Sequence, residues 1–130
     1  MDAGALGIVT GIEGGQHVGL AIFQPAVNDV ATYYFRTPFT FNTSNTVSYS
    51  LWGTTIIDDG AVLYVNGQEL NRNGVDLGAT AATWANRTVG DPAQESFSGP
   101  STVTLVNGTN ILAAEVHQVP STSSDLTWGL

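Results

Sequence analysis

The chain has 130 residues, a formal net charge of −8 and only three basic residues, all of them Arg. Binding to nucleic acids and to anionic membrane surfaces depends on cationic side chains, so this charge balance argues against both partners. A chain of this length buries roughly two thirds of its unfolded surface, which predicts one domain over residues 1–130. With no Cys, neither a disulfide framework nor a thiolate metal site is expected.

The N-terminal third predicts strands separated by loops. Residues 3–16 are rich in glycine, and we expect a loop there with one edge strand. Strands follow over residues 18–23 and 32–41. In the second of these, Pro38 cannot donate a ladder hydrogen bond and therefore indicates an edge or a bulge. The aromatic residues that share one parity, and so the predicted core face, are Tyr33, Phe35, Phe39 and Phe41.

A strand from Val47 alternates between an apolar and a hydroxyl-bearing face. Tyr49 and Leu51 lie on one side, whereas Trp52 lies on the other side with Ser48 and Ser50. If Tyr49 faces the core, Trp52 points outward. We expect it to be covered by the Trp84 segment or by a partner chain, or else to serve as a platform on which a sugar stacks.

The segment 56–70 holds the sharpest turn signals of the chain. Asp58-Asp59-Gly60 predicts a tight turn in which Gly supplies a positive φ, and Asn66-Gly67 predicts a two-residue hairpin turn after the apolar strand Ala61–Val65. The adjacent carboxylates of Asp58 and Asp59 have two interpretations. They form the turn, or they begin a Ca²⁺ site, because Ca²⁺ prefers several oxygen ligands.

The C-terminal half predicts a polar loop over residues 71–78, an irregular or weak strand over 80–89 that contains Trp84, and strands over 101–106, 110–118 and 125–130. Turns at Asn107-Gly108 and at 121–124 separate the last three strands. No stretch keeps a helical period, so we expect an all-β protein, an antiparallel β-sandwich. The predicted core consists of Phe35, Phe39, Tyr49, Leu51, Leu63, Val65, Leu112, Val116 and Trp128.

Glu115 and His117 are two residues apart on the strongest predicted strand of the C-terminal half, on the face opposite Leu112 and Val116. Two interpretations follow. If a loop covers this face, the pair is structural and bonds Arg36 or a backbone amide. If the face is open, Glu115 and His117 line a polar surface where a ligand forms hydrogen bonds, with Arg36 supplying donors.

Two motifs in order resemble the galactose-binding-like jelly rolls, including the sugar-binding domain of family 2 glycoside hydrolases. The first runs from Asp58-Asp59-Gly60 to Tyr64-Val65-Asn66-Gly67, and the second from Asn107-Gly108-Thr109-Asn110 through Ile111-Leu112-Ala113-Ala114-Glu115-Val116-His117. The same order occurs in modules of secreted bacterial phosphoesterases and large surface proteins. The resemblance covers about residues 30–130 and implies a jelly roll that is accessory to a catalytic domain elsewhere.

Two departures accompany this resemblance. The family carries an earlier strand with a Trp, which is missing here, so the chain is expected to be a fragment or to have its N-terminal edge completed by another segment. Asp58-Asp59-Gly60 also resembles the sugar-binding domains of the anthrax-protective-antigen type, where an Asp pair holds Ca²⁺ that contacts the sugar. The late strand fits the jelly roll better.

Motifs for catalysis are missing from the sequence. No Ser lies in a Gly-x-Ser-x-Gly motif, the nucleophile elbow of many hydrolases. A glycosidase needs a pair of carboxylates, and no such pair can be chosen from Glu69, Glu95 and Glu115, which are few and scattered. His17 and His117 are a hundred residues apart and the chain has no Cys, so they cannot fill a zinc shell without carboxylates. We therefore expect a protein that is not an enzyme.

Two functions fit these observations. The first is a carbohydrate-binding accessory module of a secreted, multidomain protein, in which rings stack on sugars and polar groups bond their hydroxyls. The second is a structural or self-assembling module, a homo-oligomer joined through exposed strand edges. Few charged residues and abundant Thr, Ser, Asn and Gly predict an extracellular location. The candidate sugar-binding residues are Trp52, Trp84, Asn71, Arg72, Asn73, Asp76, Arg36, Glu115 and His117, and the candidate metal ligands are Asp58 and Asp59.

Overall fold

The computed structural model describes the backbone of residues 6–9, 19–24, 30–44, 47–90, 94–120 and 126–129, and the side chains of 30–44, 48–90, 94–97 and 102–120. Nine strands and no helix occur in these residues, and hence none long and apolar enough to cross a membrane. The strands are β1 (Leu6–Val9), β2 (Gly19–Gln24), β3 (Thr32–Phe41), β4 (Val47–Asp58), β5 (Gly60–Val65), β6 (Gln68–Asn73), β7 (Gln94–Leu105), β8 (Gly108–His117) and β9 (Leu126–Gly129).

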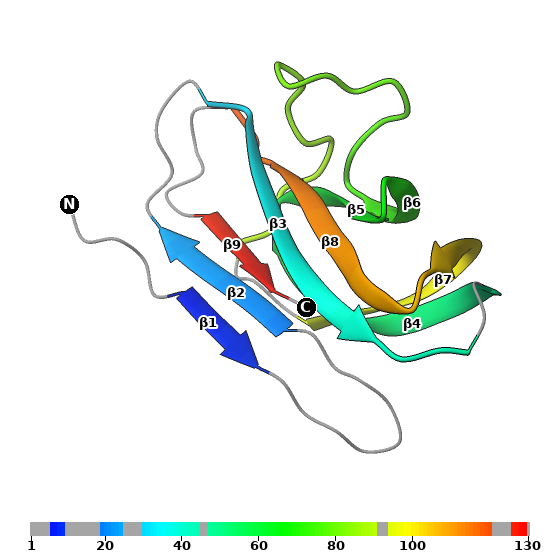
Figure 1. The fold of residues 1–130 in the computed structure, drawn as a ribbon. Helices are drawn as coiled ribbons and strands as arrows, with labels where there is room; N and C mark the ends of the chain where they lie inside the picture. Colours follow the sequence, from blue (N-terminus) through cyan, green and yellow to red (C-terminus); the bar gives the residue numbers. More distant parts are fainter. Residues whose placement is uncertain are drawn as a thin grey trace.

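The strands form two antiparallel sheets that face each other (Figure 1). The five-stranded sheet has the order β1-β2-β9-β4-β7, and the four-stranded sheet has the order β3-β8-β5-β6. The chain passes from one sheet to the other at most of its connections, and only β1 to β2 and β5 to β6 join neighbours within one sheet. The predicted all-β sandwich is therefore confirmed.

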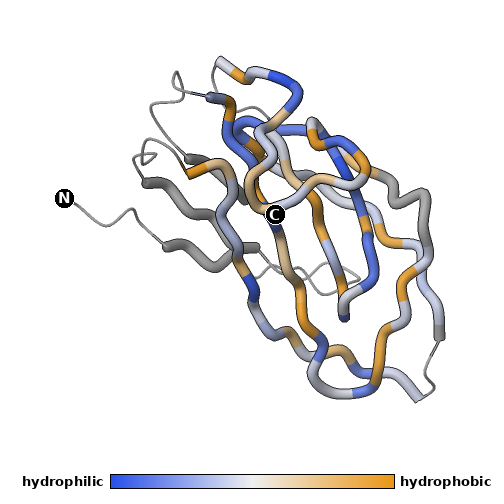
Figure 2. The backbone as a smooth tube through the Cα atoms, turned by 90° about the horizontal axis from the view of Figure 1, so that it is seen from above, coloured by the Kyte–Doolittle hydropathy of each residue, from blue (hydrophilic) through white to orange (hydrophobic). Residues whose placement is uncertain are grey.

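One hydrophobic core lies between the sheets. Its members occupy alternating positions along strands such as β5 and β8. Hydrophobic residues recur along the coloured part of the backbone in Figure 2. The buried members are Ile57, Ala61, Leu63, Val65, Leu70, Val103, Leu105, Leu112, Ala114 and Val116, and the partly buried residues packed on them include Tyr33, Phe35, Phe39, Phe41, Tyr49 and Leu51. The predicted core is confirmed at each described position, and the side chain of Trp128 lies outside the described residues.

The hairpin between β5 and β6 turns at Asn66-Gly67, as predicted. Both residues have a positive φ, 50° for Asn66 and 79° for Gly67, which matches the twist of the flanking strands. The Asn66 side chain also ties the turn to the neighbouring strands, because its Nδ2 donates to the carbonyl of Thr104 and its Oδ1 accepts the N–H of Ile111.

The strands differ from the predictions in three places. Residues 71–73 belong to β6 and not to a polar loop, β7 begins at Gln94, before the expected start at residue 101, and residues 80–89 form no strand. The segments 71–73 and 94–98 are largely polar, so their sequence favours a loop, but each pairs with a neighbouring strand. The expectation for Pro38 is confirmed, since β3 forms an edge of its sheet.

Candidate functional site

The connection between β4 and β5 consists of Asp58-Asp59-Gly60, where the chain passes between the sheets across a cis peptide bond. Both Asp residues are buried. The carboxylate of Asp59 accepts two backbone N–H groups, from Val89 at 2.8 Å and from Val119 at 3.0 Å. Asp59 thus binds two distant segments of the chain to the start of β5, the 74–90 loop and the residues that follow β8.

Gly60 is required by close packing and not by a positive φ. A Cβ atom at this position would lie only 2.5 Å from the carbonyl oxygen of Gly74. The positive φ expected for Gly60 is therefore wrong, because the residue is in an extended strand whose backbone touches the loop. The motif Asp58-Asp59-Gly60 predicts a turn, but it cannot show that the backbone of Gly74 leaves no room for a side chain at residue 60.

Arg87 and Glu95 complete this connection. The guanidinium of Arg87 donates two hydrogen bonds to the Glu95 carboxylate, at 2.6 and 2.8 Å, and its Nε donates to the Asp59 carbonyl at 2.6 Å. Asn73 donates to Glu95 as well, at 2.6 Å. The hydrogen bonds from Arg87 lower the pKa of Glu95 below its ordinary value. The amide nitrogen of Asn73 is consequently used within the fold.

The surroundings of the Asp pair fit an anchoring role better than a calcium site. Calcium takes six to eight oxygen ligands, whereas both oxygens of Asp59 already accept backbone N–H groups. The Asp58 carbonyl accepts from the Gln118 amide. Within the described residues no group of three His, Cys, Asp or Glu side chains is placed to hold a metal ion.

We expect the melting temperature to be the same in Ca²⁺ and in a chelator, because each carboxylate oxygen of Asp59 already accepts a backbone N–H group. A ligand that binds only the folded state stabilises it by mass action. Thermal melts of the apo protein with added CaCl₂ or EDTA make the measurement, and a rise of several degrees in Ca²⁺ would restore the calcium hypothesis.

The outer side of the four-stranded sheet carries a cluster that we call the polar face, formed by Tyr34, Arg36, Tyr64, Glu115 and His117. The strand register sets its layout. Tyr34 lies opposite Glu115, Arg36 and Tyr64 flank Ala113, and Thr32 lies opposite His117. The sheet therefore brings together Arg36, Glu115 and His117, as the sequence predicts, and adds two Tyr residues that the sequence analysis missed.

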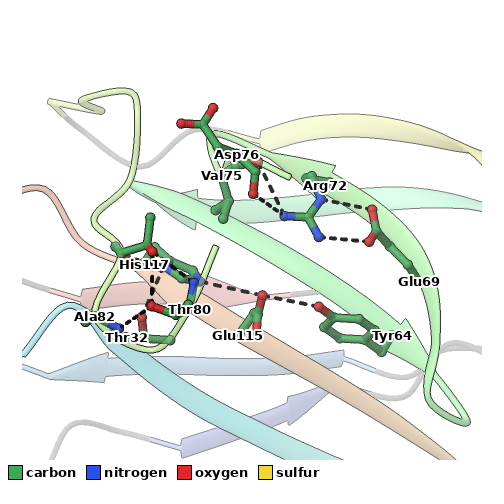
Figure 3. A network of polar contacts seen from close by, with 11 residues as sticks. Thr32, Tyr64, Glu69, Arg72, Val75, Asp76, Thr80, Ala82, Glu115 and His117 are labelled. Atoms are coloured by element: carbon green, nitrogen blue, oxygen red, sulfur yellow. Dashed lines mark hydrogen bonds and ion pairs between the residues drawn. The ribbon is translucent and has the colours of Figure 1, made fainter. Parts of the chain in front are cut away.

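His117 is held in one orientation by the 74–90 loop (Figure 3). Its Nδ1 lies 2.6 Å from the carbonyl oxygen of Thr83 and 3.1 Å from the hydroxyl of Thr32. A carbonyl oxygen only accepts, so Nδ1 carries the hydrogen and donates it. Among the described residues Nε2 has no hydrogen-bond partner, and it is buried 3.6 Å from Oε1 of Glu115, where a protonated ring would form an ion pair.

Glu115 joins His117 to Tyr64. The Tyr64 hydroxyl donates to Oε1 of Glu115 at 3.2 Å (Figure 3). Burial and, next, the negative charge of Glu115 raise the pKa of Tyr64, so its hydroxyl keeps its hydrogen. Arg36 is exposed at the other side of the face, and no ion pair of Arg36 occurs within the described residues.

The side chains of Arg72 and Asp76 form hydrogen bonds that hold the 74–90 loop in place. Arg72 donates two hydrogen bonds to Glu69, at 2.9 and 3.0 Å, and another to the Asp76 carbonyl at 2.8 Å (Figure 3). The bonds from Arg72 lower the pKa of Glu69. The carboxylate of Asp76 accepts from the Asn86 amide at 2.6 Å. Asn71 is half-buried on the same strand as Arg72.

Trp52 lies on the outer side of the other sheet, on what we call the Trp52 face. Its side chain is 83% exposed, which confirms the outward orientation predicted from parity. The expected cover by the Trp84 segment is wrong, because the neighbours of Trp84 bond the end of β8, through the Thr83 carbonyl and the Ala85 N–H. Among the residues whose side chains are described, those exposed on this face are Ser48, Ser50, Trp52 and Thr54 on β4 and Gln94, Ser96 and Thr102 on β7.

The candidate residues therefore fall into separate regions. Trp52 lies on one sheet, whereas Arg36, Glu115, His117 and the 74–90 loop with Trp84 belong to the opposite side of the sandwich. Comparisons with protein-family models, curated proteins and solved structures found no match to this chain. The class that the fold defines is an antiparallel β-sandwich.

Proposed function

We propose that the protein is a non-catalytic carbohydrate-binding module, with the Trp52 face as its binding surface. The observation that carries this proposal is the exposure of Trp52, a large apolar ring in the middle of β4 with 83% of its surface open. The preceding residue, Leu51, points the other way and packs, partly buried, against the core. An outward Trp at a rigid strand position is suited to stacking on a ligand.

The neighbours of Trp52 suit a neutral sugar. Every exposed side chain described on β4 and β7 around the ring is uncharged, and most carry a hydroxyl. Hydroxyl groups both donate and accept, as sugar hydroxyls do. The ring of Trp52 supplies the apolar surface on which the CH face of a sugar stacks, and Ser50 and Thr54 flank it along the strand.

The jelly-roll topology belongs to the same proposal. Strands β2 to β9 have the order β2-β9-β4-β7 in one sheet and β3-β8-β5-β6 in the other, which supports two interleaved Greek keys. Together with the two motifs around Asn66 and Asn110, this order supports the resemblance to galactose-binding-like accessory modules. We propose on that basis that the module belongs to a secreted, multidomain protein.

Self-assembly is the second candidate function, and the sheet edges favour it. The four-stranded sheet ends at β3 and the five-stranded sheet ends at β7, with ten and twelve residues. A long edge strand presents backbone groups that can pair with another chain. Pro38 interrupts the edge of β3, and this limits such pairing.

Replacing Trp52 by Ala should weaken glycan binding about tenfold, which corresponds to about 1.4 kcal/mol, the size expected for one aromatic contact. Binding is measured by isothermal titration calorimetry with neutral oligosaccharides of glucose, galactose, mannose and xylose. Leu77→Ala is a matched control, because Leu77 is also exposed but lies in the 74–90 loop.

The same protein samples distinguish carbohydrate binding from self-assembly. A protein dilution series followed by Trp fluorescence and sedimentation reports on self-association. Unchanged glycan affinity in Trp52→Ala, or a fluorescence signal that follows protein dilution and ignores every glycan, would reject the carbohydrate proposal and favour assembly through this surface.

A further inference from the structure

We infer that Asn107 is a site of spontaneous deamidation, and that the fold protects the other two Asn-Gly pairs of the chain from the same reaction. The three pairs are Asn66-Gly67, Asn73-Gly74 and Asn107-Gly108. None of these six residues belongs to the Trp52 face, so the inference is independent of the proposed sugar binding.

The reaction requires only the chain, a base and water. The backbone nitrogen of the Gly gives its proton to the base and attacks the side-chain carbonyl carbon, Cγ, of the preceding Asn. The side-chain nitrogen takes a proton from water and leaves as ammonia, and a five-membered succinimide ring remains. Water then adds to either carbonyl group of the ring and opens it to Asp or to isoaspartate. A Gly nucleophile favours the attack because it has no Cβ atom to block the approach.

The fold holds the side chain of Asn66 with three hydrogen bonds. Its Nδ2 donates to the Thr104 carbonyl at 3.0 Å and to Oδ1 of Asn110 at 2.8 Å, and its Oδ1 accepts the N–H of Ile111 at 2.9 Å. Release of Nδ2 as ammonia breaks at least the two bonds that this nitrogen donates. Each broken bond raises the barrier, so the reaction at Asn66 is slow in the folded protein.

Asn73 is restrained in its side chain and in its backbone. Its Nδ2 donates to Oε2 of Glu95 at 2.6 Å, and this bond also has to break before ammonia leaves. The residue belongs to β6 and pairs with Ala61, while the next carbonyl group, that of Gly74, accepts the N–H of Asn86 at 2.9 Å. The peptide unit that contains the nucleophile is therefore fixed on both sides.

Asn107 has the opposite arrangement. It is exposed in the connection between β7 and β8, and among the described residues its Nδ2 has no hydrogen-bond partner. Its Oδ1 accepts the backbone N–H of Thr43 at 3.1 Å. The attack on Cγ moves negative charge onto this oxygen, where a backbone N–H group stabilises it. At Asn107 the fold therefore supports the developing charge and does not hold the leaving nitrogen.

The product changes the connection between the two sheets. The buried side chain of Asn110 holds both sides of residue 107, because it accepts the N–H of Val106 at 2.9 Å and donates to the carbonyl groups of Val106 and Gly108 at 2.9 and 3.1 Å. Isoaspartate adds one carbon to the main chain between these groups and strains their bonds. The aged protein should therefore melt at a lower temperature than fresh protein, and it carries one more negative charge.

The experiment follows the three pairs in one sample. The folded chain is incubated in mildly alkaline buffer and cut with trypsin after Arg36, Arg72 and Arg87, which places the pairs in separate peptides, 37–72, 73–87 and 88–130. Liquid chromatography with mass spectrometry then separates Asn, Asp and isoaspartate. We expect residue 107 to react at least about ten times faster than Asn66 and Asn73, because their leaving nitrogens are bound.

Two controls accompany this measurement. In Asn107→Gln the longer side chain would have to close a six-membered ring, so peptide 88–130 should keep its mass. Incubation in urea removes the hydrogen bonds of the fold, and the three rates should become similar because each Asn precedes a Gly. If residue 107 stays Asn in the folded protein, or if Asn107→Gln still changes the mass of peptide 88–130, the site is rejected. If Asn66 or Asn73 reacts as fast as Asn107 in the folded protein, or if urea leaves the rates in their folded order, protection by the fold is rejected.

Discussion

Replacing Asp59 by Ala should lower the free energy of unfolding by about 3 kcal/mol, the largest effect we expect from removing a single polar side chain. Its carboxylate accepts the N–H groups of Val89 and Val119, which join the chain across 30 and 60 residues. Each amide left buried without a partner costs about 1–3 kcal/mol. Urea unfolding followed by circular dichroism measures the change.

Asp59→Asn should be nearly as damaging, although it is close in shape. The amide group of Asn keeps one acceptor oxygen, and its NH₂ group would face the other backbone N–H, so two donors would meet. Asp76→Ala is the matched control, because Asp76 is exposed and its carboxylate bonds only the exposed Asn86 among the described contacts. Equal stabilities of Asp59→Ala and Asp76→Ala would contradict the anchoring role.

Gly60→Ala should destabilise the fold by about 1–3 kcal/mol, the usual range for adding a methyl group to a packed site. The new Cβ would meet the Gly74 carbonyl oxygen at 2.5 Å and its carbon at 2.9 Å, and both are backbone atoms that cannot rotate away. The loop would have to move from β5, which also strains the bonds from Arg87 to Asp59 and Glu95. Thermal and urea unfolding report the loss.

Gly90→Ala controls for the effect of Ala itself. Nothing lies within 4 Å of a Cβ built at Gly90, and its φ is not positive. We expect a change near zero or a small gain, because Ala restricts the unfolded chain. If Gly60→Ala is as stable as Gly90→Ala, the close contact between β5 and the loop is not maintained in solution.

These two positions matter for the candidate sites because they fix the 74–90 loop. The loop covers His117 through the Thr83 carbonyl, and it is fastened by Asp59, Arg72 and Arg87. A variant that frees the loop should therefore alter the polar face and leave the Trp52 face intact. Glycan titration of a folded Gly60→Ala variant should therefore give the affinity of wild type, because the proposed sugar-binding surface is the Trp52 face.

The sequence alone determined the features that depend on a local period or on one turn. Alternation with a period of two placed Phe35, Tyr49 and Leu112 toward the core and Trp52 outward, because successive strand residues point to opposite faces. Asn66-Gly67 determined its hairpin, since few other residues accept a positive φ at both positions. Glu115 and His117 shared a face for the same reason.

Only the tertiary structure decided which distant residues meet. Strand β6 has a β-bulge at Leu70: Leu63 of β5 pairs with Asn71, and the next residue, Tyr64, pairs with Glu69. The bulge brings Glu69 to the same side of the sheet as Arg72, where the two side chains bond. The pairing of Arg87 with Glu95, the amides bound by Asp59 and the loop over His117 likewise depend on contacts between separate segments. Their physical origin is the requirement that each buried polar group finds a partner, and a local pattern cannot show where that partner lies.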